Sequence, residues 1–159
     1  MKFRVGIGFD LHPLAPAASI ILGGVEIPHD KGLVGHSDSD VLCHAVIDAV
    51  LGACGLGNIG QLFPDSDPRF KGISSITLVR EAAAVVRAKG FQISNVDSNI
   101  LAERPKLAPH FPAMQAKLAS ALGISTDCVS VKAKTMERLG IVGTEQAVAA
   151  EAVALVFLQ

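Results

Sequence analysis

Three side chains that commonly bind metal ions, Asp10, His12 and His44, lie in otherwise apolar segments near the start of the chain. Asp10 and His12 end an alternating run, residues 3–9, and residues two apart in an extended chain point to the same side. We predict a helix that begins near Ser37 and places His44 in its second turn, on the same face as Asp48. A carboxylate one turn away can orient the imidazole ring.

One carboxylate and two imidazoles suit zinc, and three protein ligands leave the fourth position open, as in catalytic zinc sites. An isolated Asp-x-His pair is a weak pattern, and by itself it more often marks an ordinary loop at a strand end. The residues around the pair therefore decide between the two interpretations.

An anion site is predicted beside these ligands. Residues 32–35 form a glycine-bounded loop that brings His36 and Ser37 to the expected helix start. Free backbone N–H groups and the helix dipole favour an anion there, and phosphate is the obvious ligand. Ser37 can equally be an ordinary N-cap, and the two roles are compatible.

A long loop follows the expected helix. Residues 57–68 are rich in Gly, Pro and Asp, and the segment is too long for a tight turn. Loops that cover ligands often have this composition, although a plain surface connection has it too.

Composition limits the class of protein. The 159 residues predict one domain, residues 1–159, and no apolar run is long enough for a membrane span. Because no signal peptide is evident, we expect a cytoplasmic protein. The net charge of −1, without a basic block, argues against nucleic acid and membrane surfaces as partners. The three cysteines show no metal or disulfide spacing.

The remaining elements predict the fold class. We expect a hairpin around Gly23 and Gly24, helices over about 75–89 and 109–122, and strands over 91–101 and 128–135. The last stretch, 147–158, has mixed helix and strand features, and we predict a strand. The order indicates an α+β fold, a mixed sheet with helices packed on one face. Subunit association would bury the other face.

Five motifs follow one another along the chain: GFDLH at 8–12, LGGVEIP at 22–28, GHSDSD at 35–40, LFPDSDPRFKG at 62–72 and VKAKTME at 131–137. Together they resemble one enzyme family, the 2-C-methyl-D-erythritol 2,4-cyclodiphosphate synthases. The resemblance implies an enzyme of non-mevalonate isoprenoid biosynthesis that converts 4-diphosphocytidyl-2-C-methyl-D-erythritol 2-phosphate to the cyclic diphosphate and releases CMP. It also implies a homotrimer, with the sheets around the three-fold axis and active sites between subunits.

The resemblance further implies roles for single residues. Zinc would be bound by Asp10, His12 and His44, and a second divalent ion, Mg²⁺ or Mn²⁺, by Glu137 through the diphosphate. His36 and Thr135 would stabilise the transition state. The implied substrate-binding residues are Ser37, Asn58, Ile59, Gly60, Phe63, Pro64, Asp65, Ser66, Asp67, Lys134 and Ile141. The implied cytidine pocket consists of Ala102, Glu103, Arg104, Pro105, Lys106, Leu107 and Ala108.

Two positions depart from the family pattern. The family usually has Asp where this chain has Asn58, so an uncharged amide would meet the erythritol hydroxyls. An arginine usually stands where this chain has Thr144, and with an aromatic at the position of Ile141 it lines an axial cavity for isoprenoid phosphates. We do not expect that secondary site in this chain.

The chemistry agrees with the residues, because the 2-phosphate of the substrate is itself the nucleophile and no protein base is needed. The protein then has to position the substrate and neutralise the charge of its phosphates, and His36, Ser37, Lys106 and the metals can do this. The alternative is a non-catalytic trimeric module that binds a phosphorylated ligand and uses zinc structurally. A structural site normally has four protein ligands, and no fourth partner is apparent.

Overall fold

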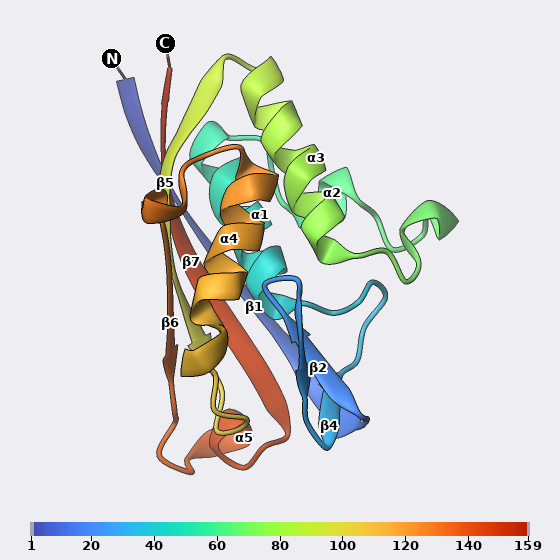
Figure 1. The fold of residues 1–159 in the computed structure, drawn as a ribbon. Helices are drawn as coiled ribbons and strands as arrows, with labels where there is room; N and C mark the ends of the chain where they lie inside the picture. Colours follow the sequence, from blue (N-terminus) through green and yellow to red (C-terminus); the bar gives the residue numbers. More distant parts are fainter. Residues whose placement is uncertain (1, 159) are drawn as a thin grey trace.

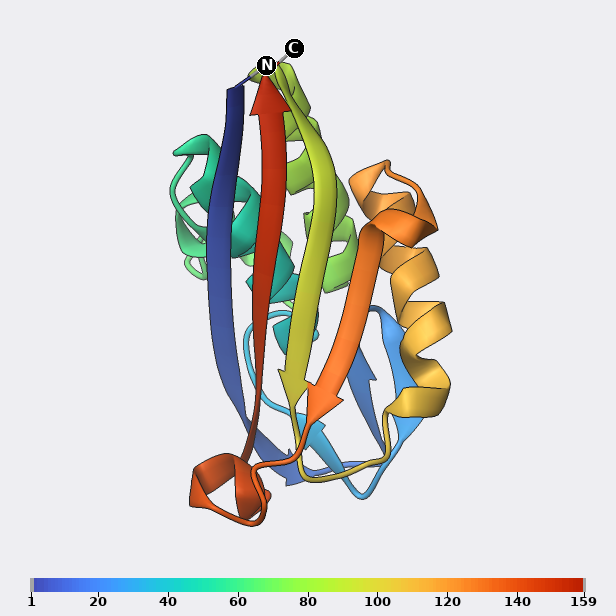
Figure 2. The same ribbon diagram turned by 90° about the vertical axis from the view of Figure 1, so that its left-hand side faces the viewer.

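A five-stranded mixed sheet with helices on one face forms the body of the computed structural model, which describes residues 2–158. Figure 1 shows the layers, and Figure 2 looks onto the face of the sheet that carries no helix. The strands are β1 (Lys2–Pro16), β2 (Ser19–Leu22), β3 (Val25–Pro28), β4 (Lys31–Leu33), β5 (Phe91–Leu101), β6 (Val129–Lys134) and β7 (Ala147–Leu158). The helices are α1 (Val41–Cys54), α2 (Ile59–Leu62), α3 (Ser75–Ala88), α4 (Phe111–Leu122) and α5 (Gly140–Gly143), with short 3-10 turns η1 (Pro68–Phe70), η2 (Ala108–His110) and η3 (Thr126–Cys128).

The sheet order is β4-β1-β7-β5-β6, and β2 and β3 form a separate hairpin. β7 runs antiparallel to β1 and β5, whereas β5 and β6 are parallel, so the sheet is mixed as predicted. The predicted hairpin is confirmed, as are the strands over 91–101 and 147–158. Since β7 lies between β1 and β5 and pairs with both along its length, the ambiguous final stretch is the centre of the sheet.

The predicted helix start near Ser37 is wrong, because α1 begins at Val41 with Asp40 as its N-cap. The buried carboxylate of Asp40 accepts the N–H of Cys43 in the first turn, and it also accepts the N–H groups of Gly23 and Gly24 in the β2–β3 turn. These three bonds fix where the helix starts, and they attach the hairpin to it. His44 consequently lies in the first turn of α1.

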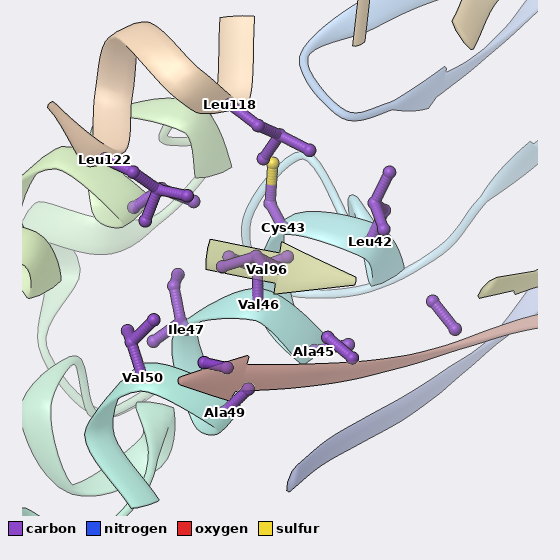
Figure 3. Close-up of a cluster of buried hydrophobic side chains, with 14 of the residues drawn as sticks. Leu42, Cys43, Ala45, Val46, Ile47, Ala49, Val50, Val96, Leu118 and Leu122 are labelled. Carbon is purple, nitrogen blue, oxygen red and sulfur yellow. The ribbon is translucent and has the colours of Figure 1, made fainter. Parts of the chain in front are cut away.

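Helix α1 is apolar nearly all round because it lies between the sheet and the other helices. Figure 3 shows Val46 and Val50 of α1 among Val96 of β5 and Leu118 and Leu122 of α4, all buried. Burial of such side chains is the main stabilising contribution to a fold of this size.

Two glycines let α1 approach β1 closely. A Cβ added at Gly8 would lie 2.0 Å from the carbonyl oxygen of Ala45, and one added at Gly6 would lie 2.0 Å from that of Ala49. Any larger residue at either position would push the helix and the strand apart.

The outer face of β1 is apolar and exposed. Phe3, Val5, Ile7 and Phe9 have exposed fractions of 58%, 68%, 74% and 56%. The predicted placement of helices on one face is therefore confirmed. A continuous exposed apolar face of this kind is typical of an interaction surface.

Within residues 2–158, no helix is both long and apolar enough to cross a membrane.

Candidate metal centre and active site

The three predicted metal ligands converge in space. Asp10 and His12 come from β1 and His44 from α1. Asp10 Oδ2 lies 2.9 Å from His44 Nδ1 and 3.0 Å from His12 Nε2, and these two nitrogens are 3.2 Å apart. Ligands of a tetrahedral zinc ion at 2.0–2.1 Å would be spaced by about 3.3 Å, so a small shift of the side chains accommodates the ion. The alternation along β1 explains the geometry, because Gly6, Gly8, Asp10 and His12 share the face toward α1.

Each imidazole directs one nitrogen to the centre because the other nitrogen has a partner. His12 Nδ1 lies 3.1 Å from the carbonyl oxygen of Val34, and His44 Nε2 lies 2.9 Å from Ser75 Oγ and 3.0 Å from Ser37 Oγ. The prediction that Asp48 orients His44 is wrong. Asp48 instead accepts the backbone N–H of Ile59 at 2.7 Å, which attaches the following loop to α1.

The electrostatics of the cluster suit a cation. Burial raises the pKa of the Asp10 carboxyl, but hydrogen bonds and charge attraction from His12 and His44 outweigh it and lower the pKa overall. The hydrogen bond to Asp10 raises the pKa of His12, against the effect of burial. A divalent ion would take the place of the shared protons, and Asp10 is ionised at neutral pH and ready to bind it.

A cavity of about 200 Å³ opens beside the three ligands. It brings together much of the predicted site, and its lining consists of Asp10, His12, His36, Ser37, His44, Ile59, Gly60, Phe63, Asp65, Phe70 and Leu78. Phe63 is buried, and its ring packs edge-on against Phe70, with the centroids 5.3 Å apart. Phe70 and Leu78 were not among the predicted site residues, since they look in the sequence like ordinary loop and helix residues.

His36 has an unusual environment. Its Nε2 atom is buried and makes no hydrogen bond to any residue that the structure describes. Leaving a buried polar nitrogen unpaired costs free energy, so such groups often serve a ligand. The position of His36 in the cavity wall agrees with contact to a bound anion.

Several predicted substrate-binding residues lie outside this cavity lining. Asn58 is the N-cap of α2, and its side chain accepts the N–H of Gln61 at 3.0 Å. Asp67 caps the turn at η1 and pairs with Arg69. Pro64 and Ser66 belong to the same loop without lining the cavity, and Ile141 in α5 is 52% exposed.

A second pocket, about 600 Å³, lies at the opposite edge of the sheet. It is lined by all of residues 102–108 together with Phe111, Ala133, Lys134 and Thr135. The hydroxyl of Thr135 donates to Glu137 at 2.7 Å.

The two pockets are well separated within one chain. Asp10 and Ile100 both pair with Ala150, and Ile100 pairs with Ala133, so these residues form one row across the sheet. Three strand spacings put Asp10 about 14 Å from Ala133. The metal ligands therefore lie together, whereas Lys134, Thr135 and residues 102–108 lie together elsewhere.

Known proteins match the whole chain. The 2-C-methyl-D-erythritol 2,4-cyclodiphosphate synthase of Dechloromonas aromatica (strain RCB) is 56% identical over 156 residues, which are 98% of each chain. Among solved structures, the bifunctional IspDF from Campylobacter jejuni superimposes with a TM-score of 0.95 at 39% identity, over 99% of this chain and 43% of that one. A 2C-methyl-D-erythritol-2,4-cyclodiphosphate synthase in a CDP-bound form gives 0.89 at 38% identity, over 97% of this chain and 100% of that one.

The match to a family covers almost the same range as these relatives. Residues 3–157 match the YgbB family, a range that includes all three metal ligands and both pockets. By this match and by the full-length relatives, the chain belongs to the YgbB family.

Proposed function

We propose that this protein converts 4-diphosphocytidyl-2-C-methyl-D-erythritol 2-phosphate to 2-C-methyl-D-erythritol 2,4-cyclodiphosphate and CMP. The observation that carries the proposal is the convergence of Asp10, His12 and His44 at a cavity that His36 and Ser37 also line. Relatives 55–56% identical over nearly the whole chain bear the name of this synthase. A non-catalytic module with structural zinc is less well supported, because the described ligand cluster has three members and opens into a cavity.

The reaction is an intramolecular phosphoryl transfer. An oxygen of the 2-phosphate attacks the diphosphate phosphorus that is bonded to the 4-oxygen of the erythritol. A new P–O bond closes the ring, and CMP leaves with the electrons of the P–O bond that joined it to the attacked phosphorus. A zinc ion at Asp10, His12 and His44, when bound, would supply charge neutralisation and orientation of the phosphate. Ser37 can donate its hydroxyl proton to a phosphate oxygen, and a turn of the His36 side chain in the same wall would bring a ring nitrogen to another.

In this proposal, the loop that contains Phe63 and Asp65 covers the active site. Phe63 packs on Phe70 and presents an apolar wall to the cavity, which keeps water from competing with ring closure. Ile59 and Gly60 line the cavity at the start of α2, which the bond from Ile59 N–H to Asp48 holds against α1. Asn58 would then contribute to substrate binding both as the N-cap that orients α2 and through any direct hydrogen bond to the substrate.

The second pocket is the proposed cytidine site, and residues 102–108 with Lys134 and Thr135 would line it. The structure of a related synthase has been solved in a CDP-bound form, which supports a nucleotide pocket in this family. Glu137, bonded to Thr135, would hold Mg²⁺ or Mn²⁺ with help from the substrate diphosphate.

We propose further that the protein is a homotrimer, with the exposed apolar sheet faces packed around a three-fold axis. Phe3, Val5 and Ile7 would then be buried between subunits. The separation of the two pockets within one chain supports an active site between subunits, since the edge that carries β6 in one copy could complete the metal pocket beside β1 of the next. Light scattering should give three times the monomer mass, and a stable monomer at micromolar concentration would contradict the proposal.

The activity is tested by measuring CMP release and following the cyclic product by ³¹P NMR. The matched control is the same diphosphocytidyl compound without the 2-phosphate, which lacks the nucleophile and should release no CMP. CMP release from both compounds would indicate hydrolysis and overturn the proposal.

His44→Ala tests the role of the metal centre in the same assay. This variant should lose both bound zinc and turnover, because it removes one of three ligands. A variant with full activity would show that the metal cluster is not the catalytic centre.

A further inference from the structure

A carboxylate and a serine hydroxyl behind the metal centre form a chain of hydrogen bonds to His44. Ser75, at the first turn of α3, is fully buried, and its Oγ lies 2.9 Å from His44 Nε2. The same hydroxyl donates to Asp38 Oδ1, and the backbone N–H of Ser75 donates to Asp38 Oδ2 at 2.9 Å. Neither Ser75 nor Asp38 lines the cavity that contains the metal ligands.

The proton positions in this chain follow from the chemistry of its members. An ionised carboxylate only accepts hydrogen bonds, so the single hydroxyl proton of Ser75 goes to Asp38. Ser75 can then act toward His44 only as an acceptor, and His44 Nε2 has to carry the ring proton. When a metal ion takes the place of the proton shared with Asp10, the lone pair of His44 is therefore on Nδ1, the atom that lies 2.9 Å from Asp10 Oδ2.

We infer that Ser75 and Asp38 are positioning residues of the metal centre, which fix the tautomer and the ring orientation of His44. This inference rests on the metal site of the proposed function, but it concerns metal binding and stands apart from turnover. A histidine ligand whose other ring nitrogen donates to a fixed acceptor is a more basic and better oriented ligand. The acceptor here is made rigid because Asp38 holds both the hydroxyl and the backbone of Ser75.

The same chain leaves Ser37 available to the substrate. Ser37 Oγ also lies near His44 Nε2, at 3.0 Å, and 3.3 Å from Ser75 Oγ. It accepts the N–H of Ser39, but no carboxylate among residues 2–158 accepts its proton. Since Ser75 serves as the acceptor for His44, the hydroxyl proton of Ser37 can turn toward a phosphate in the cavity without loss of the His44 tautomer.

Ser75→Ala removes the acceptor and should weaken Zn²⁺ binding by about 10- to 100-fold, measured by competition with a chromophoric chelator. Co²⁺ loaded in place of zinc should show altered visible bands, because the His44 ring is no longer fixed. Ser74→Ala is the matched control, since the neighbouring Ser74 is exposed and its side chain makes no capping bond. Its zinc affinity should equal that of the wild type.

Asp38→Asn tests whether Asp38 acts through Ser75. As a single substitution, Asp38→Asn should weaken Zn²⁺ binding. Combined with Ser75→Ala, it should add little to the loss that Ser75→Ala already causes, because Asp38 then has no hydroxyl through which to act on His44. Additive losses would overturn the role assigned to Asp38, and wild-type zinc affinity in Ser75→Ala would overturn the inference as a whole.

The tautomer itself can be read in the unmutated protein, which avoids any folding defect of the variants. In ¹⁵N-histidine-labelled protein loaded with zinc, His44 should show a protonated Nε2 and a metal-bound Nδ1. Metal bound at Nε2 would overturn the inference. If the protein released no CMP but these results held, the proposed reaction would fail while the role of Ser75 and Asp38 stood.

Discussion

Gly8→Ala should damage the metal centre through packing alone, without removing any ligand. The added Cβ would lie 2.0 Å from the carbonyl oxygen of Ala45 and 2.8 Å from the nitrogen of Ala49. Both contacts are with the backbone of α1, so no side-chain rotation relieves them. The helix has to move away from β1 by about 1 Å to restore even a tight contact.

That displacement acts directly on the ligands, because His44 precedes Ala45 in α1 and Asp10 follows Gly8 in β1. The ligand atoms are now 2.9–3.2 Å apart, and metal–ligand distances tolerate only about 0.2 Å of error. Overpacking of a core costs about 1–3 kcal/mol. We therefore expect loss of tight zinc binding together with a lower free energy of unfolding.

Two other glycines serve as matched comparisons. The Cβ added by Gly6→Ala would approach the backbone of Ala49 and Ala53 equally closely, but about one turn farther from His44. Gly6→Ala should therefore lower the free energy of unfolding about as much as Gly8→Ala does, but lower the zinc affinity less. Gly52→Ala should leave zinc affinity unchanged, since its Cβ would meet only the carbonyl of Ile7 at 3.8 Å. The free energy of unfolding of Gly52→Ala should rise by about 0.5–1 kcal/mol, because alanine replaces glycine within a helix.

The assay combines chelator competition for zinc with urea unfolding of the metal-free proteins. Folded Gly8→Ala protein with wild-type zinc affinity would refute the reasoning. Equal zinc losses in Gly8→Ala and Gly6→Ala would show that the metal site responds to overall stability and not to the local distance between α1 and β1.

Three further changes test other features. Asp40→Asn should lower the free energy of unfolding by roughly 1–3 kcal/mol in urea denaturation, since one of the N–H groups that the carboxylate accepts would face an NH₂ group; unchanged stability would contradict this. Glu137→Gln should leave the zinc content intact and raise the Mg²⁺ or Mn²⁺ concentration needed for CMP release, whereas an unaltered requirement would remove Glu137 from the metal site. Asn58→Asp should keep the α2 cap and lower the KM for substrate, and an equal or higher KM would show that Asn58 does not meet the erythritol hydroxyls.

Local periodicity predicted the parts of the site that depend on one strand. The two-residue spacing of Asp10 and His12 requires only an extended chain, and β1 supplies it along Lys2–Pro16. The strand over 147–158 was predicted from the large apolar residues Val153, Leu155, Val156 and Phe157, and its alanines are explained by the close packing of α1 on β7. The α+β class and the one-sided cover of helices followed from the order of elements.

Tertiary contacts decided what the sequence did not predict. The start of α1 depends on the hydrogen bonds that Asp40 accepts from the β2–β3 turn, and the hydrophobic periodicity of the sequence does not predict those bonds. Asp48 has the helical spacing to reach His44 but bonds to Ile59 instead, because α2 folds back onto α1. Ser75 reads as a helix-start residue, and only the meeting of α3 with α1 brings it to His44.

The alternation along β1 has a consequence for how this segment can change over evolution or in design. One face of the strand carries Gly6, Gly8, Asp10 and His12 toward α1, and the other carries Phe3, Val5, Ile7 and Phe9 outward. A one-residue insertion or deletion within it would exchange the two sets beyond that point, so a single event would bury phenylalanines against the helix and carry the metal ligands to the outer face. A substitution on the outer face of β1 leaves this division between the two faces in place, whereas a change of length is compatible with it only in the loop that follows the strand.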